Sequence, residues 1–159
     1  MTTPSYQRWT TLEFLEFCHP DIRRFHAYWD AKREGRRLPS RADIDPAEMI
    51  PFLPNLILVD VESREPLSLT YRLVGTREVE ARGRDPTHLP VAEGFYCYSR
   101  DEALLSYRLV VESRAPMFCD DTKASPHCRL IEHGSLFLPL SDDGETVNKV
   151  MVYTVYRAS

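Results

Sequence analysis

Apolar residues recur along the chain first at helical spacing and later mostly at every second position, which is typical of an α+β domain. Ile22, Phe25 and Trp29 lie three and four residues apart, and Gly35 follows them. This spacing predicts an amphipathic helix over residues 20–34, which begins with a proline in its first turn and ends at the glycine.

Two strands are predicted in the first half of the chain. Residues 56–61 are a short apolar run, and residues 67–73 alternate between apolar and polar side chains. Because a turn-forming segment, 63–66, separates them, we expect an antiparallel hairpin.

The middle of the chain carries capping signals for two further helices. Thr76 is expected to cap a short helix that ends at Gly83. Ser99 and Glu102 have the spacing of a capping box, which predicts a longer helix that ends near Arg114.

The last third of the chain returns to alternating apolar positions. Strands are predicted over residues 117–120, 128–140 and 147–156. Gly134 interrupts the second of these strands and is expected to mark a β-bulge.

This element order predicts one α+β domain, with a five-stranded antiparallel sheet, helices on one face and an extra N-terminal helix. The first and last strands are expected to lie side by side. Residues 1–10 are interpreted as a loose leader, and Asp45 and Glu48 predict another short helix by reciprocal capping. We therefore divide the chain into an N-terminal leader and helix, 1–42, and a single compact unit, 43–159.

Four local strings in this order resemble the PAS_5 family of bacterial standalone PAS-like domains, and together they span most of the chain. The strings are Tyr28-Trp29, Pro39-x-Arg41 with Asp43-Ile44-Asp45-Pro46, Tyr71-Arg72-Leu73-Val74-Gly75-Thr76 and Leu138-Pro139-Leu140-Ser141-Asp142-Asp143-Gly144. The resemblance implies a PAS-like fold and a sensory or protein-interaction role, and it implies no particular ligand.

One position departs from the family pattern. The loop after the short helix usually resembles G-x-D-x-T-G, whereas this chain has His88 at the last position. Glycine adopts backbone conformations that a histidine resists, so the shape of this loop is expected to differ.

The resemblance also locates a pocket, because PAS ligands lie between the sheet and the middle helices. The matching side chains are Tyr71, Phe95, Tyr98, Leu104, Tyr107, Val111 and Leu138. An apolar lining with a few hydroxyl groups suits a small ligand. The same large residues equally suit a filled core, which close packing favours.

Cysteine and histidine residues are the main candidates for metal or nucleophilic chemistry. Cys119, His127, Cys128 and His133 lie within fifteen residues, but their spacing matches no usual zinc motif, so no metal is expected. A small enzyme would need Cys119 with a nearby histidine as its base. Because the chain has no nucleophile elbow or cysteine-protease string, we expect no enzyme activity. No flavin-attachment or haem string is recognised, so no cofactor is expected.

Charge excludes two classes of partner. The formal net charge is -4, which gives no general attraction to nucleic acid or to an anionic membrane. Arg77, Arg82 and Arg84 accompany no phosphate-binding loop and are interpreted as a solvated face. The cysteines show no CxxC spacing and no signal peptide is recognised, so a reducing cytoplasm is the expected compartment.

The sequence therefore predicts a sensory or regulatory domain without its own output domain, acting on a protein partner or on a small apolar ligand. Phe14, Phe17, Phe25 and Trp29 need burial, either on the domain's own sheet or against a second chain. We expect a homodimer through the N-terminal helix or the sheet face. A purely structural interaction module remains the alternative that needs no ligand.

Overall fold

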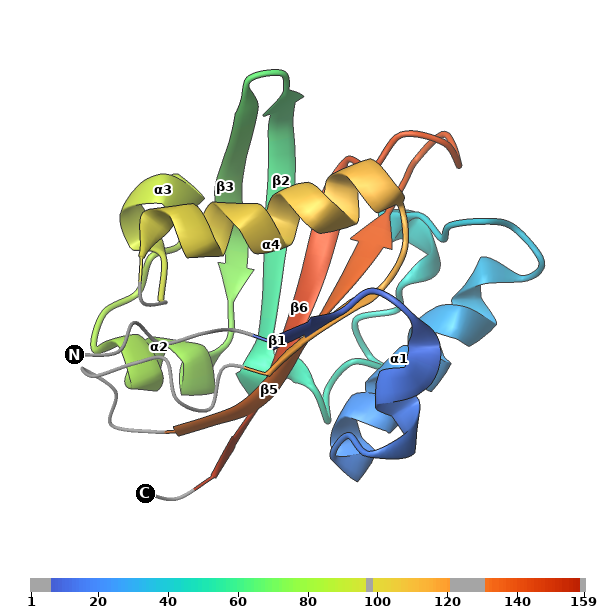
Figure 1. The fold of residues 1–159 in the computed structure, drawn as a ribbon, viewed down its shortest axis with the longest axis horizontal. Coiled ribbons are helices and arrows are strands. Elements are labelled where there is room, and N and C mark those ends of the chain that lie inside the picture. Colours follow the sequence, from blue (N-terminus) through green and yellow to red (C-terminus); the bar gives the residue numbers. More distant parts are fainter. Residues whose placement is uncertain (1–6, 97–98, 121–130, 158–159) are drawn as a thin grey trace.

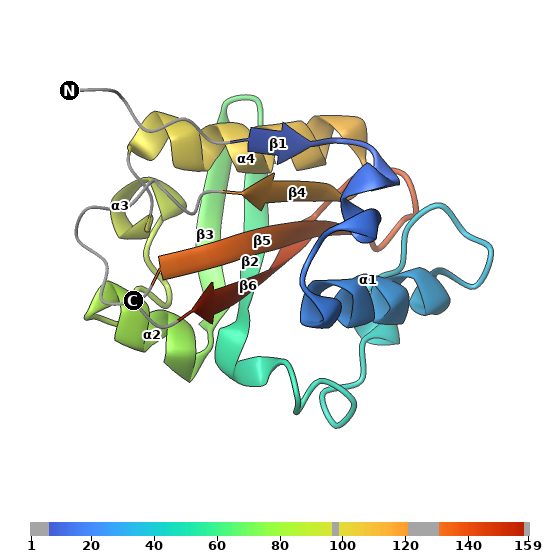
Figure 2. The ribbon, with the colours of Figure 1, turned by 60° about the horizontal axis from the view of Figure 1, so that its bottom comes forward.

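All the strands that the structure describes belong to one antiparallel sheet. The computed structural model describes residues 7–96, 99–120 and 131–157. The sheet has six strands in the order β1-β4-β5-β6-β2-β3 (Figures 1 and 2). The strands are β1 (Gln7–Trp9), β2 (Leu56–Arg64), β3 (Leu67–Val74), β4 (Met117–Asp120), β5 (Ile131–Leu140) and β6 (Lys149–Arg157). The helices are α1 (Pro20–Arg33), α2 (Thr76–Arg82), α3 (Val91–Gly94) and α4 (Arg100–Ser113), with short 3-10 turns at Leu12–Glu16, Arg41–Asp43 and Leu53–Asn55.

The strand pairing confirms the predicted single sheet. β2 and β3 form the expected hairpin, and β2 also pairs with β6, so the first and last predicted strands are neighbours. The predicted bulge is present, because the register of β5 and β6 shifts between Glu132 and Gly134. Gly134 has φ of 139°, a conformation that disfavours other residues. Residues 128–130, the predicted start of β5, lie outside the described residues.

Residues 7–9, which were predicted to be part of a loose leader, form a sixth strand. The predicted count of five strands was therefore wrong. β1 pairs with β4, with Arg8 opposite Cys119. The ring of Trp9 lies 5.1 Å from that of Phe17 and 5.7 Å from that of Phe118. These aromatic contacts hold a segment that is too short to show an alternating pattern.

Helices cover both faces of the sheet rather than one face as expected. Tyr107 of α4 contacts Phe137 of β5, with ring centroids 5.2 Å apart. Phe25 of α1 contacts Tyr153 of β6 at 5.0 Å. Phe137 pairs with Val152, so the two side chains point to the same face, whereas Tyr153, the next residue of β6, points to the opposite face. The helices α4 and α1 therefore lie on opposite sides of the sheet. Figure 2 shows this arrangement.

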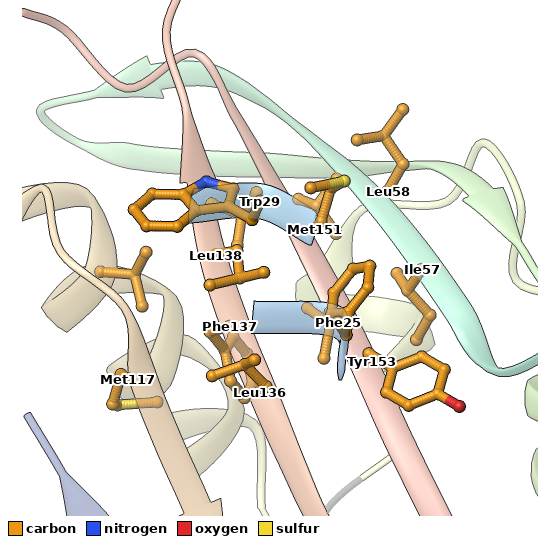
Figure 3. Close-up of a cluster of buried hydrophobic side chains, with 14 of the residues drawn as sticks. Phe25, Trp29, Ile57, Leu58, Met117, Leu136, Phe137, Leu138, Met151 and Tyr153 are labelled. Atoms are coloured by element: carbon orange, nitrogen blue, oxygen red, sulfur yellow. The ribbon is translucent and has the colours of Figure 1, made fainter. Parts of the chain in front are cut away.

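The apolar side of α1 packs on the protein's own sheet. Figure 3 shows Phe25 and Trp29 over the side chains of Leu138, Met151 and Tyr153. The indole Nε1 of Trp29 also donates a hydrogen bond of 2.8 Å to a backbone carbonyl of β5. The helix occupies the predicted residues. Its aromatic side chains, Phe25 and Trp29, are buried by these contacts within the chain itself.

The capping predictions were correct for Ser99 of α4, where one of the two bonds of the expected capping box is shown, and partly wrong elsewhere. The Ser99 hydroxyl accepts a hydrogen bond from the Glu102 N–H at 3.1 Å, as expected. Thr76 is the first helical residue of α2, and Gly75 takes the cap position without a side-chain bond. Glycine is needed there because a Cβ would lie 2.1 Å from the carbonyl oxygen of Leu53.

The helix expected at Asp45 is a series of turns instead. Asp45 accepts a hydrogen bond from the N–H of Ala47 at 2.9 Å. Glu48 contacts α1 rather than reaching back to Asp45, because its carboxylate accepts from Tyr28 and pairs with Lys32. Contacts between distant segments therefore replace the local reciprocal cap.

No helix within the described residues is long and apolar enough to cross a membrane.

Two phenylalanines near the N-terminus provide a test of this packing. Phe25 is fully buried, whereas Phe17 is 55% exposed. We expect Phe25→Ala to lower the free energy of unfolding by about 3–5 kcal/mol, because a large cavity remains. Phe17→Ala should lower it by about 1 kcal/mol or less. Chemical denaturation measures both values, and equal losses would contradict the observed packing of α1.

Candidate functional site

A small cavity lies between α4 and the sheet. Its volume is about 50 Å³, which is roughly four times the minimum space for one water molecule. Side chains from three helices or loops and from five strands surround it. The lining residues are Ile57, Tyr71, Glu78, Arg82, Tyr96, Ala103, Ser106, Tyr107, Cys119, Ser135, Phe137, Val152 and Thr154.

The cavity arises from small side chains on the inner side of α4. Ala103 and Ser106 are three residues apart, so they share one face of the helix, and both are buried. Ile57 and Val152 are paired on the same face of the sheet below them. Large residues at positions 103 and 106 would fill the space that these two leave.

An ion pair is buried at one side of the cavity. Glu78 and Arg82 lie four residues apart in α2, with 2.8 Å between Oε2 of Glu78 and an Nη atom of Arg82. The side chains are only 1% and 7% exposed. Tyr156 of β6 donates its hydroxyl hydrogen to the same Oε2. This pair connects the short helix to the last strand.

Burial controls the protonation of the pair. Desolvation raises the pKa of Glu78 above its ordinary value, and Arg82 and Tyr156 oppose that effect. Burial lowers the pKa of Arg82, but the combined effects of Glu78, Tyr71 and Tyr156 outweigh it and raise the pKa, so the guanidinium remains charged. The guanidinium also lies 5.7 Å from the ring centroid of Tyr71 and 5.0 Å from that of Tyr96, at cation–π distance.

Three polar atoms of the residues that line the cavity are buried without a hydrogen-bond partner among the described residues. They are Oε1 of Glu78, Nε of Arg82 and the hydroxyl oxygen of Tyr96. Each such group costs about 1–3 kcal/mol when its water contacts are lost without replacement. All three belong to residues that line the same cavity.

The N-terminal strand is attached to the helix that roofs the cavity. Nε of Arg8 donates to the Ser106 hydroxyl at 3.1 Å, and an Nη atom pairs with the Glu102 carboxylate at 2.8 Å. A second bond from the same Nη atom reaches the Glu102 carbonyl at 3.0 Å. Ser106 therefore contacts the cavity and also holds β1.

His88 adopts the backbone conformation that the sequence led us to expect it would resist. Its φ is 73°, in the left-handed region. The N–H of His88 donates to the Tyr71 carbonyl at 2.8 Å, and the N–H of Tyr71 donates to the Leu89 carbonyl at 3.0 Å. These bonds to β3 stabilise a glycine-like turn despite the side chain, because histidine is among the residues that tolerate this region best.

The predicted pocket residues divide between several places. Tyr71 and Tyr107 line the cavity. Val111 lies beside a separate groove near the end of α4, and Leu138 is fully buried on the α1 face. The remaining candidates are the partly buried Leu104 of α4, Phe95 at the end of α3, and Tyr98, which lies outside the described residues.

Sequence reasoning missed the charged part of the site. Arg82 was assigned to a solvated face, and this was wrong because its side chain is only 7% exposed. The spacing of Glu78 and Arg82 suits an ordinary surface pair on a short helix. Gly75, at the start of α2, was the available sign that the helix lies close to other backbone.

The cysteine and histidine candidates are only partly described. Cys119 is buried in β4 and lines the cavity. His127 and Cys128 lie outside the described residues, as does the side chain of His133. In the part of the chain that the structure describes, no three histidine, cysteine or acidic side chains group as a metal site.

Comparison with known families agrees with the fold. The model of the family PAS_5, described as a PAS domain, matches residues 17–153. The chain belongs to this PAS domain family. The matched region of this PAS domain begins just before α1 and ends within β6. No curated protein and no solved structure matches the chain.

The buried ion pair predicts strong energetic coupling. We expect Arg82→Met to lower the free energy of unfolding by about 3–5 kcal/mol, because it leaves the Glu78 carboxylate buried without its partner. The double variant Glu78→Leu with Arg82→Met should lower the free energy of unfolding by less than Arg82→Met alone. A double-mutant cycle by chemical denaturation measures this coupling.

Arg108 and Glu112 provide the control, since they have the same sequence separation and are 43% and 66% exposed. Arg108→Met should change the free energy of unfolding by about 0.5 kcal/mol or less. Equal losses of stability in Arg82→Met and Arg108→Met would contradict the burial of the pair formed by Glu78 and Arg82.

The raised pKa of Glu78 predicts a particular pH dependence. The folded state holds the Glu78 proton more tightly than the unfolded state does, for which the ordinary value is about 4.3. Its contribution to stability is therefore complete below that value and is lost as pH rises through the folded-state pKa. Chemical denaturation at a series of pH values checks this prediction. The difference in free energy of unfolding between the native chain and Glu78→Gln should fall as pH rises through this range.

Asp143 should behave in the opposite way. Backbone N–H groups of Thr146 and Glu145, and the Ser141 hydroxyl, lower the pKa of Asp143 to about 2. Its contribution is complete above about pH 4 and is lost as pH falls. The same pH series with Asp143→Asn checks the direction of this dependence. If stability changed with pH in the same direction for Asp143 and Glu78, the opposite pKa shifts given to these two carboxyl groups would be refuted.

Proposed function

We propose that this PAS domain is a sensory module that binds a small molecule in the cavity under α4 and reports its presence to a protein partner. Family membership indicates a sensory or interaction module. The observation that carries the finer proposal is the set of buried polar atoms of Glu78, Arg82 and Tyr96 that lack partners among the described residues. A bound molecule that satisfies them recovers the cost of their desolvation.

The chemistry of the lining supports binding rather than catalysis. The two charges compensate each other, and Glu78 already accepts hydrogen bonds from Arg82 and Tyr156. A general base needs a lone pair within reach of a substrate proton and a partner that orients the reacting group. The engaged carboxylate is better suited to hold a ligand in place. A small enzyme that uses Cys119 with a histidine remains the alternative.

The contacts of α4 offer a route for the signal. Ser106 lines the cavity and accepts a hydrogen bond from Arg8 of β1. A ligand that changes the position of this hydroxyl changes the contact between α4 and the N-terminal strand. Occupancy then biases the attachment of β1, provided that the ligand binds the two arrangements with different affinity. The N-terminal strand is therefore the proposed surface that a partner reads.

Two expectations from the sequence stay as proposals beside this one. A homodimer through the N-terminal helix or the sheet face remains a prediction, and so does a cytoplasmic location. The purely structural module is less well supported, because a filled core would not surround unpaired polar groups with a cavity of about 50 Å³.

Filling the cavity tests the proposal. Ala103→Val adds two methyl groups where the side chain faces the cavity, and it should abolish small-molecule binding while the fold is retained. Leu105→Val is the matched control, because Leu105 lies on the same helix and is 40% exposed. Amide chemical shifts during titration with a library of small polar fragments measure binding. Fragments that bind only at sites untouched by Ala103→Val would overturn the proposal.

A further inference from the structure

Two cavities of similar size lie on opposite faces of the sheet, and they differ in chemistry. The second, of about 70 Å³, is lined mainly by aliphatic side chains and Met49 and Met151, with Arg41 at its edge. The guanidinium of Arg41 is already bonded to the Ile44 carbonyl at 3.1 Å. The residues that line the cavity under α4 instead carry both an acceptor and donors without a partner in the described part of the chain. The contrast indicates that the polar lining serves recognition, because packing alone is achieved without it on the other face.

The available hydrogen-bonding groups define what a ligand must offer. Oε1 of Glu78 can only accept while the carboxyl is ionised, and Nε of Arg82 can only donate. The Tyr96 hydroxyl can do both. A ligand that satisfies the set therefore carries at least one N–H or O–H group and one oxygen or nitrogen acceptor.

The charges define what the ligand must avoid. The carboxylate and the guanidinium are 2.8 Å apart and neutralise each other. A charged ligand would lose its hydration without gaining an uncompensated opposite charge. An anion would also face the acceptor of Glu78, and a cation would face the donor of Arg82. A buried group left unpaired by the wrong ligand is a strong source of discrimination.

Resting on the function proposed above, we propose that the cavity selects a small, uncharged amide-like molecule, with one donor for Glu78 and one acceptor for Arg82. About 50 Å³ is enough for roughly four water-sized groups. The ligand, or the part of it that enters, therefore has the size of acetamide. The small apolar ligand expected from the sequence would leave all three polar atoms unpaired.

An isosteric series separates charge from shape. Acetamide, acetate and acetamidinium have nearly the same size, but only acetamide is neutral with both a donor and an acceptor. A ligand with four heavy atoms binds no tighter than about 40 µM even at the best known efficiency, so NMR titration at millimolar concentrations and constant ionic strength is suitable. We expect acetamide to shift the amide signals of Ala103, Ser106 and Thr154, with a dissociation constant at least about 10-fold lower than those of the two ions.

Variants of the polar atoms test the assignment of each group. Glu78→Gln removes the negative charge and leaves Arg82, so the preference for acetamide over acetate should fall at least about 10-fold. Tyr96→Phe removes a buried hydroxyl that has no partner among the described residues. It should weaken acetamide binding by roughly 3-fold or more without lowering the midpoint of unfolding, so it remains informative if Glu78→Gln fails to fold.

The possible outcomes distinguish this inference from the proposed function. Acetate or acetamidinium binding in the cavity as tightly as acetamide would overturn the ligand class and leave a small-molecule sensor in place. An unchanged acetamide affinity in Tyr96→Phe would also overturn the assignment. If none of the three probes binds, and a crystal soaked in acetamide contains water alone in the cavity, both the inference and the proposed function are wrong.

Discussion

The arrangement of the whole domain depends on β5 and β6 being buried on both faces. Residues 150–155 of β6 are all buried, although their side chains point alternately to the two sides of the sheet. A sheet with two apolar faces needs a covering layer on each. α4 with its neighbours supplies one layer and α1 supplies the other. The N-terminal helix is thus part of the core, which agrees with a family match that begins at residue 17.

The two covering layers are packed differently. On the α1 side, Phe25 and Trp29 cover the sheet (Figure 3), and the cavity on that face is lined mainly by aliphatic side chains. On the α4 side, Ala103 and Ser106 are small and leave a cavity beside buried charges. A buried ion pair is weak evidence for stability, because desolvation offsets most of its attraction. Natural proteins depart from good packing and complete hydrogen bonding mainly at functional sites. This departure is the physical reason to place the function under α4.

The site also joins segments that are distant along the chain. Glu78 and Arg82 of α2 are bonded to Tyr156 near the end of β6. Ser106 of α4 is bonded to Arg8 of β1. Under the proposed function, a ligand in the cavity would therefore act on the short helix, the last strand and the N-terminal strand together. For a sensory domain, this connection matters more than the small volume of the cavity.

Sequence alone determined the elements with a clear period and their ends. The hairpin of β2 and β3, the long helices α1 and α4, the Ser99 cap and the Gly134 bulge all follow from local spacing and local backbone chemistry. Tyr71 and Tyr107, two of the predicted pocket residues, line the cavity. The period of a segment shows which residues share a face. It does not show which distant element covers that face.

Tertiary structure decided the remaining features for that reason. Leu138 and Phe137 are neighbours in β5, yet a difference of one residue places Leu138 on the α1 face and Phe137 at the cavity. β1 forms because it pairs with β4 and because its Trp9 ring packs against the rings of Phe17 and Phe118. Glu78 and Arg82 are buried against tyrosines from distant segments, and Tyr156 is 78 residues away from Glu78. Local spacing cannot encode a contact at that separation, so the charged part of the site emerged only in the folded chain.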